Sequence, residues 1–118
     1  MAQQFDPHKI LEHLQELSVQ LLEFTNEAER LDEEAVRAAI RHEMAYARAY
    51  TTGAGSIEDR KQAAKLLTES EALDAELAAA KLRACQRRIQ ALRQRIDVGR
   101  SLNAAQRSEW AAAGVVNQ

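Results

Sequence analysis

Apolar residues recur in alternating steps of four and three along the first part of this chain. The residues in this spacing are Ile10, Leu14, Leu17, Leu21, Phe24, Ala28, Leu31 and Ala35. Such a spacing, sustained over several heptads, is typical of a helix in a left-handed coiled coil. Beyond Leu31 the apolar positions move to another phase, at Val36, Ile40, Met44 or Ala45, Ala47 and Tyr50. This change predicts either a stutter in one helix or a break.

Two signals predict where this first helix begins and how far it runs. Asp6 and Pro7 suit the start, because an aspartate at the N-cap accepts backbone N–H bonds and a proline at the first helical position loses none. We expect the helix to span residues 7–51. Asn26 and Glu29 resemble a capping box, so a break between residues 25 and 32 stays open.

A glycine-rich stretch then predicts a loop over residues 52–56. Gly53 and Gly55 supply turn conformations, and Ser56 with Asp59 resembles a capping box that starts the next helix. That helix is expected over residues 57–98. Its apolar stripe changes phase near residues 77–85, which predicts a second stutter. The two stripes are Leu66, Leu73, Leu77, Ala80 and Ala84, followed by Leu82, Cys85, Ile89, Leu92 and Ile96.

A glycine marks the end of the second helix. Gly99 predicts a stop or a bend, and Ser101 is a suitable cap for a short third helix over residues 102–113. We expect Trp110, the one tryptophan, to pack this short helix back onto the two longer ones. Tyr46 and Tyr50 are expected to cap the core at the loop end.

These elements predict an all-α fold in a single helical domain over residues 1–118. A short loop makes two long helices antiparallel neighbours, so the expected architecture is an elongated antiparallel helical hairpin or coiled coil with a short third C-terminal helix. Alanine buries little area and aromatics are only 4% of the chain, so we expect a homo-oligomer. The predicted core and oligomer seam comprises Ile10, Leu14, Leu17, Leu21, Phe24, Leu82, Ile89, Leu92 and Ile96.

Acidic and basic residues are separated along the chain. Residues 1–80 contain 16 Asp+Glu and 8 Lys+Arg, a net charge of −8. Residues 81–118 contain 2 Asp+Glu and 8 Lys+Arg, a net charge of +6. The basic residues of the second part flank the apolar seam or point outward, so they are expected to form a ridge. They are Lys81, Arg83, Arg87, Arg88, Arg93, Arg95, Arg100 and Arg107.

Three interpretations of this basic ridge stay open. The arginines can pair with acids of the first helix, within a subunit or across an interface, as charges beside coiled-coil seams often do. They can instead bind nucleic acid without reading its sequence, because the planar guanidinium donates two parallel bonds to a phosphate. The ridge can also contact an acidic protein partner.

The chain offers little catalytic chemistry. His42 and Glu43 begin a zinc-protease HExxH pattern, but Tyr46 stands where the second histidine must be. Cys85 is the only cysteine, which fits a reducing compartment. No apolar run reaches the about 18 residues of a membrane span, and the N-terminus lacks a basic region followed by an apolar one. We expect no enzyme, no cofactor, no metal site, no membrane segment and a cytoplasmic location.

Several segments resemble small all-helical proteins of tailed phages. They are Ala45-Tyr46-Ala47-Arg48-Ala49-Tyr50, the glycine loop, Asp59-Arg60-Lys61-Gln62-Ala63, Ile96-Asp97-Val98-Gly99-Arg100-Ser101-Leu102 and Arg107-Ser108-Glu109. Over residues 35–110 the layout is similar to that of the UvsY-type recombination mediators. That resemblance implies rings of subunits that bind single-stranded DNA and help a recombinase displace the single-strand-binding protein. It also implies that the basic positions from Lys81 to Arg100 contact the DNA.

The sequence therefore predicts a non-enzymatic phage accessory protein that binds single-stranded nucleic acid through its basic helix, in recombination or replication. Its expected partners are further copies of the chain, single-stranded DNA, and a recombinase or a single-strand-binding protein. Two alternatives lack nucleic-acid binding. One is a structural or partner-binding coiled-coil adaptor, and the other is an inhibitor of a host or phage protein.

Overall fold

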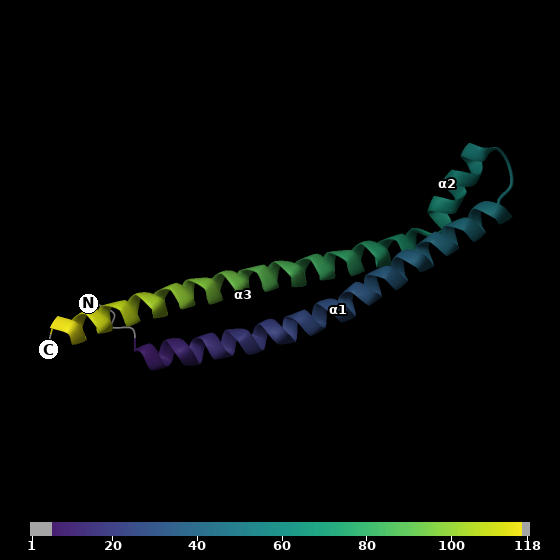
Figure 1. Ribbon diagram of the computed structural model, residues 1–118. Helices are drawn as coiled ribbons and strands as arrows, with labels where there is room; N and C mark the ends of the chain where they lie inside the picture. Colours follow the sequence, from purple (N-terminus) through teal and green to yellow (C-terminus); the bar gives the residue numbers. More distant parts are fainter. Residues whose placement is uncertain (1–5, 117–118) are drawn as a thin grey trace. The chain divides into compact units, whose positions relative to one another are not determined.

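The computed structural model describes residues 6–116 and contains, in that range, three α-helices and no strand (Figure 1). They are α1 (Pro7–Thr52), α2 (Ile57–Leu67) and α3 (Glu69–Val116). The prediction of an all-α fold is therefore confirmed. α1 is a single helix, so there is no break between residues 25 and 32.

The chain divides into two compact units, whereas the sequence predicts a single domain. Unit 1 comprises Met1–Thr25 and Arg87–Gln118, and unit 2 comprises Asn26–Gln86. Each unit contains a stretch of α1 and a stretch of α3, and α2 belongs wholly to unit 2. The two units differ in the side chains that they bury.

In unit 1 the first part of α1 and the last part of α3 pack in opposite directions (Figure 1). Leu14 of α1 lies against Gly99 of α3, because a Cβ added at Gly99 would come within 2.6 Å of Leu14 Cδ2. Further along α1, the centroid of the Phe24 ring lies 5.9 Å from Cζ of Arg88. Residue numbers thus rise along α1 as they fall along α3, which confirms an antiparallel hairpin in this unit.

Large aliphatic side chains fill the seam of unit 1. Leu17, Leu92 and Ile96 are 2%, 4% and 6% exposed and form its core. Burying a side chain of this size stabilises the fold by about 1.5–3 kcal/mol. The seam residues that the sequence predicts for this unit are all buried or half-buried: Ile10, Leu14, Leu17, Leu21, Phe24, Ile89, Leu92 and Ile96.

The packed side of α1 keeps one spacing along the whole helix. After Leu31, buried or half-buried positions continue in steps of three and four at Ala35, Ala38, His42, Ala45 and Ala49. The predicted change of phase is therefore wrong, and Val36, Ile40 and Met44 are 52%, 51% and 52% exposed. Residues spaced by four drift about 40° around a helix at each step, so their stripe cannot follow a partner helix, whereas alternating steps can.

The packed side of α3 behaves in the same way. Its buried or half-buried positions in this spacing are Ala75, Ala78, Leu82, Cys85, Ile89, Leu92, Ile96, Gly99, Asn103 and Gln106. The predicted stutter near residues 77–85 is therefore wrong, and Leu73 and Leu77 are 57% and 51% exposed. Small residues serve in a seam because the distance between two helix axes adjusts to the side chains at the contact.

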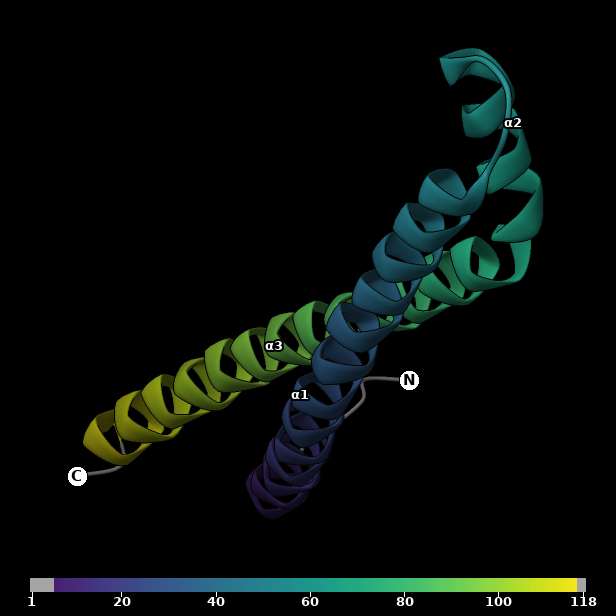
Figure 2. The same ribbon diagram turned by 90° about the vertical axis from the view of Figure 1, so that its right-hand side faces the viewer.

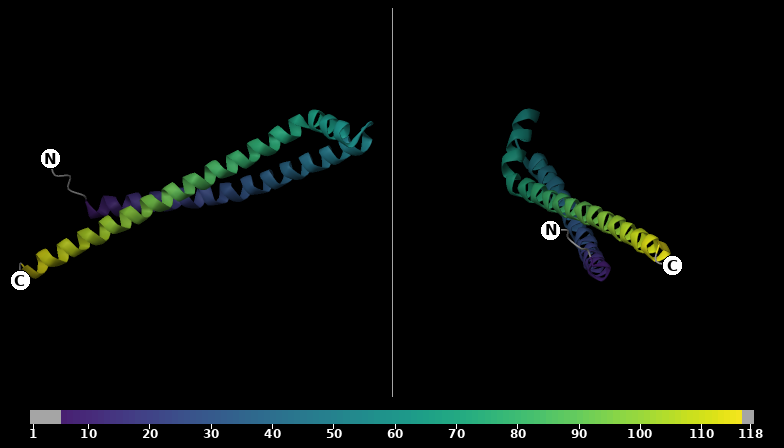
Figure 3. Two further views of the ribbon diagram at one scale, coloured as in Figure 1. Left: turned by 90° about the horizontal axis from the view of Figure 1, so that it is seen from above. Right: turned by 90° about the vertical axis from the view of Figure 1, so that its left-hand side faces the viewer.

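α3 runs through Gly99 and Gly114 to Val116 without a break (Figure 3). The predicted short third helix over residues 102–113 is therefore not a separate element. The helix does not end at Gly99. The absence of a side chain there makes room for Leu14 in the seam. Ser101 is no cap either, since its hydroxyl donates to the Asp97 carbonyl at 3.0 Å inside the helix.

The loop between α1 and α2 covers residues 53–56, close to the predicted 52–56 (Figure 2). Gly55 has a φ of 98°, a conformation that favours glycine. The N–H of Asp59 donates to Ser56 Oγ at 3.1 Å, and the N–H of Ser56 donates to Asp59 Oδ2 at 3.2 Å. These reciprocal bonds confirm the capping box at the start of α2.

The predicted helix over residues 57–98 is interrupted at Thr68, where α2 ends and α3 follows (Figure 2). The backbone N–H and the hydroxyl of Thr68 both donate to the Ala64 carbonyl, at 3.1 and 2.7 Å. Thr68 is buried, at 3% exposure, and marks a break that neither glycine nor proline signals.

Unit 2 buries small side chains. Apart from Leu31 at 7% exposure, its buried apolar residues are Ala38, Ala64 and Cys85. A single buried carbon contributes only about 0.8 kcal/mol, well below a leucine. Eight large apolar side chains of unit 2 are more than half exposed: Val36, Ile40, Met44, Ile57, Leu66, Leu67, Leu73 and Leu77.

Candidate nucleic-acid interface

Six of the eight predicted basic residues lie on the part of α3 that belongs to unit 1, on both flanks of its seam and on its outer side. We call them the basic face: Arg87, Arg88, Arg93, Arg95, Arg100 and Arg107. All six are exposed. The other two predicted residues, Lys81 and Arg83, are also exposed but belong to unit 2.

The basic face follows the heptad of α3. Arg93, Arg100 and Arg107 each come directly after a seam residue and are spaced by seven. Residues with this spacing lie on one side of the helix, about 10 Å apart along its axis. Arg88 and Arg95 each come directly before a seam residue and take the other side. The arginines therefore lie on two flanks of α3, as predicted, with the buried seam residues between them.

The predicted pairing of these arginines with acids of the first helix does not occur within the described chain, residues 6–116. No carboxylate oxygen there lies within 4.0 Å of a nitrogen of the basic face. Pairing across an interface with another copy remains a hypothesis. Arg88 makes a contact of another kind, because its guanidinium lies over the Phe24 ring.

Acids of α1 instead pair with arginines of α1. Arg30 binds both Glu27 and Glu34, and Arg37 Nη2 lies 2.8 Å from Glu33 Oε1. The hydrogen bond from Arg30 lowers the pKa of Glu27, and its positive charge adds to this effect. The same bond from the other side raises the pKa of Arg30. These acids are thus partly neutralised without the basic face.

The side of unit 1 that carries Arg93, Arg100 and Arg107 has no acid facing it from α1. In an antiparallel pair, residues that follow seam positions on one helix face those that follow seam positions on the other. On α1 these residues are uncharged: Leu11, Ser18 and Thr25. Asp97 of α3 lies four residues after Arg93 and three before Arg100, Glu109 lies two residues after Arg107, and Asp6 lines the same hollow as Arg107. Within the described chain none of these acids makes an ion pair with the three arginines, so this line of arginines is open to an anion.

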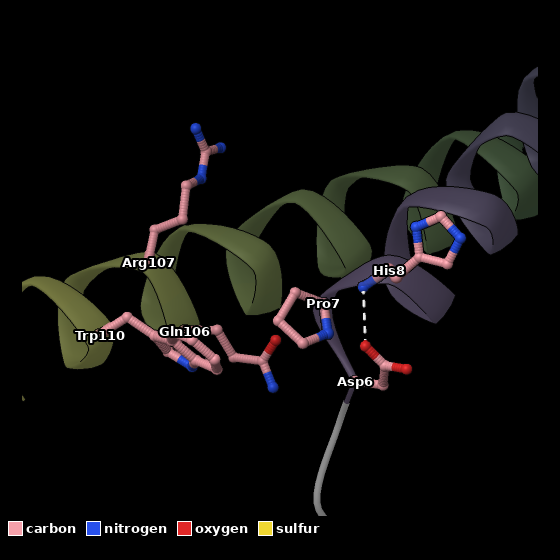
Figure 4. Close-up of a pocket in the computed structure, with 6 residues that line it drawn as sticks. All are labelled: Asp6, Pro7, His8, Gln106, Arg107 and Trp110. Atoms are coloured by element: carbon pink, nitrogen blue, oxygen red, sulfur yellow. Dashed lines mark hydrogen bonds between the residues drawn. The ribbon is translucent and has the colours of Figure 1, made fainter.

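The predicted packing of Trp110 is wrong, because its side chain is 69% exposed. It lies on α3 one turn beyond Arg107, beside a hollow of about 430 Å³ that Figure 4 shows. The residues that line the hollow are Asp6, Pro7, His8, Gln106, Arg107 and Trp110. The seam spacing could have revealed this site. It places Trp110 on the packed side of α3, seven residues after Asn103, but past the point where α1 begins, so α1 does not cover the indole.

Other candidate chemistry is sparse in the described part of the chain. No group of three or more His, Cys, Asp or Glu in residues 6–116 is placed to hold a metal ion. No described helix is long and apolar enough to cross a membrane. Tyr46 and Tyr50 stack with ring centroids 6.5 Å apart and are half-buried, consistent with their predicted position beside the core of unit 2.

The basic face and Trp110 are thus both exposed in unit 1, beside exposed aliphatic side chains such as Val19 and Leu22. No protein-family model, curated protein or solved structure matches this chain. The resemblance to recombination mediators accordingly stays a prediction from sequence pattern.

Proposed function

We propose that this protein binds single-stranded nucleic acid through the basic face, without reading its sequence. The observation that carries the proposal is a set of six exposed guanidinium groups on one helix with no carboxylate within 4.0 Å in the described chain. Guanidinium groups bind phosphates through two parallel hydrogen bonds. Neutralising several phosphates also releases counterions, which supplies affinity independent of sequence.

A single strand fits this arrangement better than a duplex. The three arginines at spacing seven form a line along one helix, and a flexible strand can bend to follow such a line. A duplex is stiff over about 150 base pairs, so it could meet this straight line but could not bend around the helix to Arg88 and Arg95. The net charge of the whole chain is −2, so attraction to phosphate comes from such local groups of arginines and not from the chain as a whole.

The cellular role follows from the resemblance to recombination mediators. On that basis the protein is a non-enzymatic phage accessory in recombination or replication, acting beside a recombinase or a single-strand-binding protein. The basic face would hold the strand while the recombinase loads. A location in the host cytoplasm accompanies this role.

The test is a salt titration of binding to a fluorescein-labelled oligothymidylate, followed by fluorescence anisotropy. Changing Arg93→Gln together with Arg100→Gln removes two phosphate contacts. The slope of log affinity against log salt should then become shallower by about 1.4, at about 0.7 per phosphate for a single strand. The matched control is Arg41→Gln with Arg48→Gln, which removes the same charge from exposed positions of α1 in unit 2.

Two results would contradict the proposal. One is no measurable binding by the unaltered chain at low salt. The other is an equal loss of slope in the variant of α3 and in the control of α1, since this would show a general charge effect and no defined face.

We further propose that copies of the chain associate through unit 2. Its exposed apolar side chains lie on the outer sides of α1 and α3, while alanines fill its seam. A two-fold interface places the same patch of two subunits together, so Val36, Ile40 and Met44 of one copy would meet those of the next over a short contact where the two helices cross. Association would also bring several basic faces onto one strand and raise its affinity through multivalency.

A second candidate function uses the same apolar side chains. If the chain remains a single copy in solution, these side chains are free to dock another protein, and the molecule is then a partner-binding adaptor. Binding to such a partner would change little with salt, because apolar burial is not screened. The oligonucleotide titration and the mass in solution separate the two functions.

A further inference from the structure

The indole of Trp110 is the largest exposed aromatic surface beside the basic face. It is 69% exposed, although burying an aromatic ring of this size is among the strongest stabilising contributions a side chain can make. Trp110 lies three residues after Arg107, so it is its neighbour on the helix surface. The line formed by Arg93, Arg100 and Arg107 therefore ends at a flat, apolar ring.

The hollow beside Trp110 is a built recess in unit 1. Figure 4 shows the indole and the Gln106 side chain beside the ring of Pro7, whereas the guanidinium of Arg107 points away from the hollow. The hollow is open to solvent on one side, so a flat group could enter beside the indole. A flat group in the hollow and an anionic group at Arg107 would thus be held on different sides of the same helix turn.

One charge decides which part of a nucleotide the hollow can take. Asp6 lines it and accepts a hydrogen bond from the backbone N–H of His8 at 3.0 Å through Oδ1. Its carboxylate would repel a phosphate in the hollow but can accept a hydrogen bond from an N–H group of a base, such as the ring N–H of thymine. Other ligands match only half of this surface. An acidic helix could pair with the arginines but has no flat face for the indole, and an apolar peptide could cover the indole but has no charge for the arginines.

We propose that Trp110 stacks on an unpaired base of the nucleic-acid strand whose phosphates Arg100 and Arg107 contact. The inference rests on the proposed function and assigns one residue to base contact. Stacking on an aromatic ring tolerates any sequence, because every base has a π face. Losing one such stack typically weakens binding about 5- to 150-fold.

The test uses the full chain and the fluorescence of Trp110, its only tryptophan. Adding oligothymidylate should quench this fluorescence in parallel with the anisotropy of the labelled strand. Trp110→Leu, which keeps an apolar side chain without a π face, should weaken binding about 5- to 150-fold. Trp110→Phe should restore much of the affinity. Circular dichroism should show both variants as helical as the parent, because the side chain is exposed.

Polyphosphate supplies the charge without the bases. It should compete with the oligonucleotide for the arginines and leave the fluorescence of Trp110 unchanged. Equal quenching by polyphosphate would overturn the inference, as would unaltered affinity in Trp110→Leu. In both cases an affinity that still depends on Arg93 and Arg100 would leave the proposed function standing.

Two further outcomes separate the explanations. If the parent chain binds no oligonucleotide at low salt, the proposed function fails and takes the inference with it. If the fluorescence changes with protein concentration alone, and Trp110→Leu shifts the mass in solution, then a second copy covers the indole and base stacking is wrong.

Discussion

Units 1 and 2 differ in the apolar side chains that they bury, although both expose large apolar side chains on their outer surfaces. Unit 1 buries leucine and isoleucine between its helices and exposes six arginines. Unit 2 buries mainly alanine and cysteine, while eight large apolar side chains face outward. Both follow the same alternating spacing of seam positions. The comparison teaches that a heptad fixes which positions pack, while the size of the residues there decides whether the unit is stable alone.

This difference suggests separate tasks for the two units. The seam of unit 1 supplies enough burial to hold a helix pair whose outer surface can carry repelling charges. The seam of unit 2 supplies less, so its stability gains from covering the outer side chains with another chain.

The largest expected effect comes from emptying the seam of unit 1. Leu17→Ala should lower the free energy of unfolding by about 2–5 kcal/mol, because it leaves a cavity between the helices. Leu17 is 2% exposed, whereas Val19 on the same helix is 58% exposed. Val19→Ala is therefore the matched control and should cost about 0.5 kcal/mol or less. Urea unfolding followed by circular dichroism measures both, and equal costs would show that unit 1 has no seam at Leu17.

The next effect concerns the outer side of unit 2. Ile40→Ser with Leu77→Ser should raise the dissociation constant between copies at least about tenfold, because each apolar side chain buried on association is worth about 1.5–3 kcal/mol. Light scattering over a range of concentrations measures this. Val19→Ser with Leu22→Ser, exposed in unit 1, is the control and should leave the mass unchanged. A parent chain that stays a single copy at all concentrations would contradict association and favour the adaptor function.

The smallest effect concerns the acids of α1. Arg30→Gln should raise the pKa of Glu27 back toward its ordinary value, because the hydrogen bond and the nearby charge that lower it are both removed. Since the pKa of Glu27 is lowered by folding, its ion pair stabilises the chain above the ordinary glutamate pKa. That stabilisation is lost as the pH falls through the lowered value.

Carboxyl chemical shifts in an NMR titration measure this pKa, with Arg37→Gln as the control because Arg37 pairs with Glu33 instead. The pKa of Glu27 should stay lowered in that control. If the pKa of Glu27 stays lowered in Arg30→Gln, then Arg30 is not the cation that lowers it, and another basic group must be.

Much of unit 1 could be predicted because its seam residues are bulky. Leu14, Leu17 and Ile96 are apolar at heptad spacing, and burial of such residues outweighs other local choices. In unit 2 the bulky apolar residues lie outside the seam, and alanines occupy many of the seam positions. Val36, Ile40 and Met44 form an apolar stripe that sequence reasoning takes for the core, but the helix partner follows the alanines. Apolar character alone could not decide between the two faces.

The breaks were harder to predict than the helices. Glycine often ends a helix, yet at Gly99 the helix α3 continues, and Leu14 from a distant part of the chain packs against it. Thr68 carries no glycine or proline signal, yet α2 ends there, at a buried side chain. Local propensities amount to about 1 kcal/mol per residue, so a single packing contact can reverse them.

The candidate site divides along the same line. The arginines and their two flanks could be predicted, because helix periodicity places charges relative to the seam. That Leu11, Ser18 and Thr25 face the line of Arg93, Arg100 and Arg107 depends on which residues of α1 lie opposite α3. The exposure of Trp110 depends on where α1 begins relative to α3.

The sequence by itself determined the helical class, the seam of unit 1, the capping box at Ser56 and the separation of charge, because each follows from spacing or from residues a few positions apart. Only the tertiary structure decided the register of the helices, and with it the burial of Gly99, the outward apolar face of unit 2 and the open line of arginines. Register depends on contacts between residues far apart in the chain, and no local pattern records which of them meet.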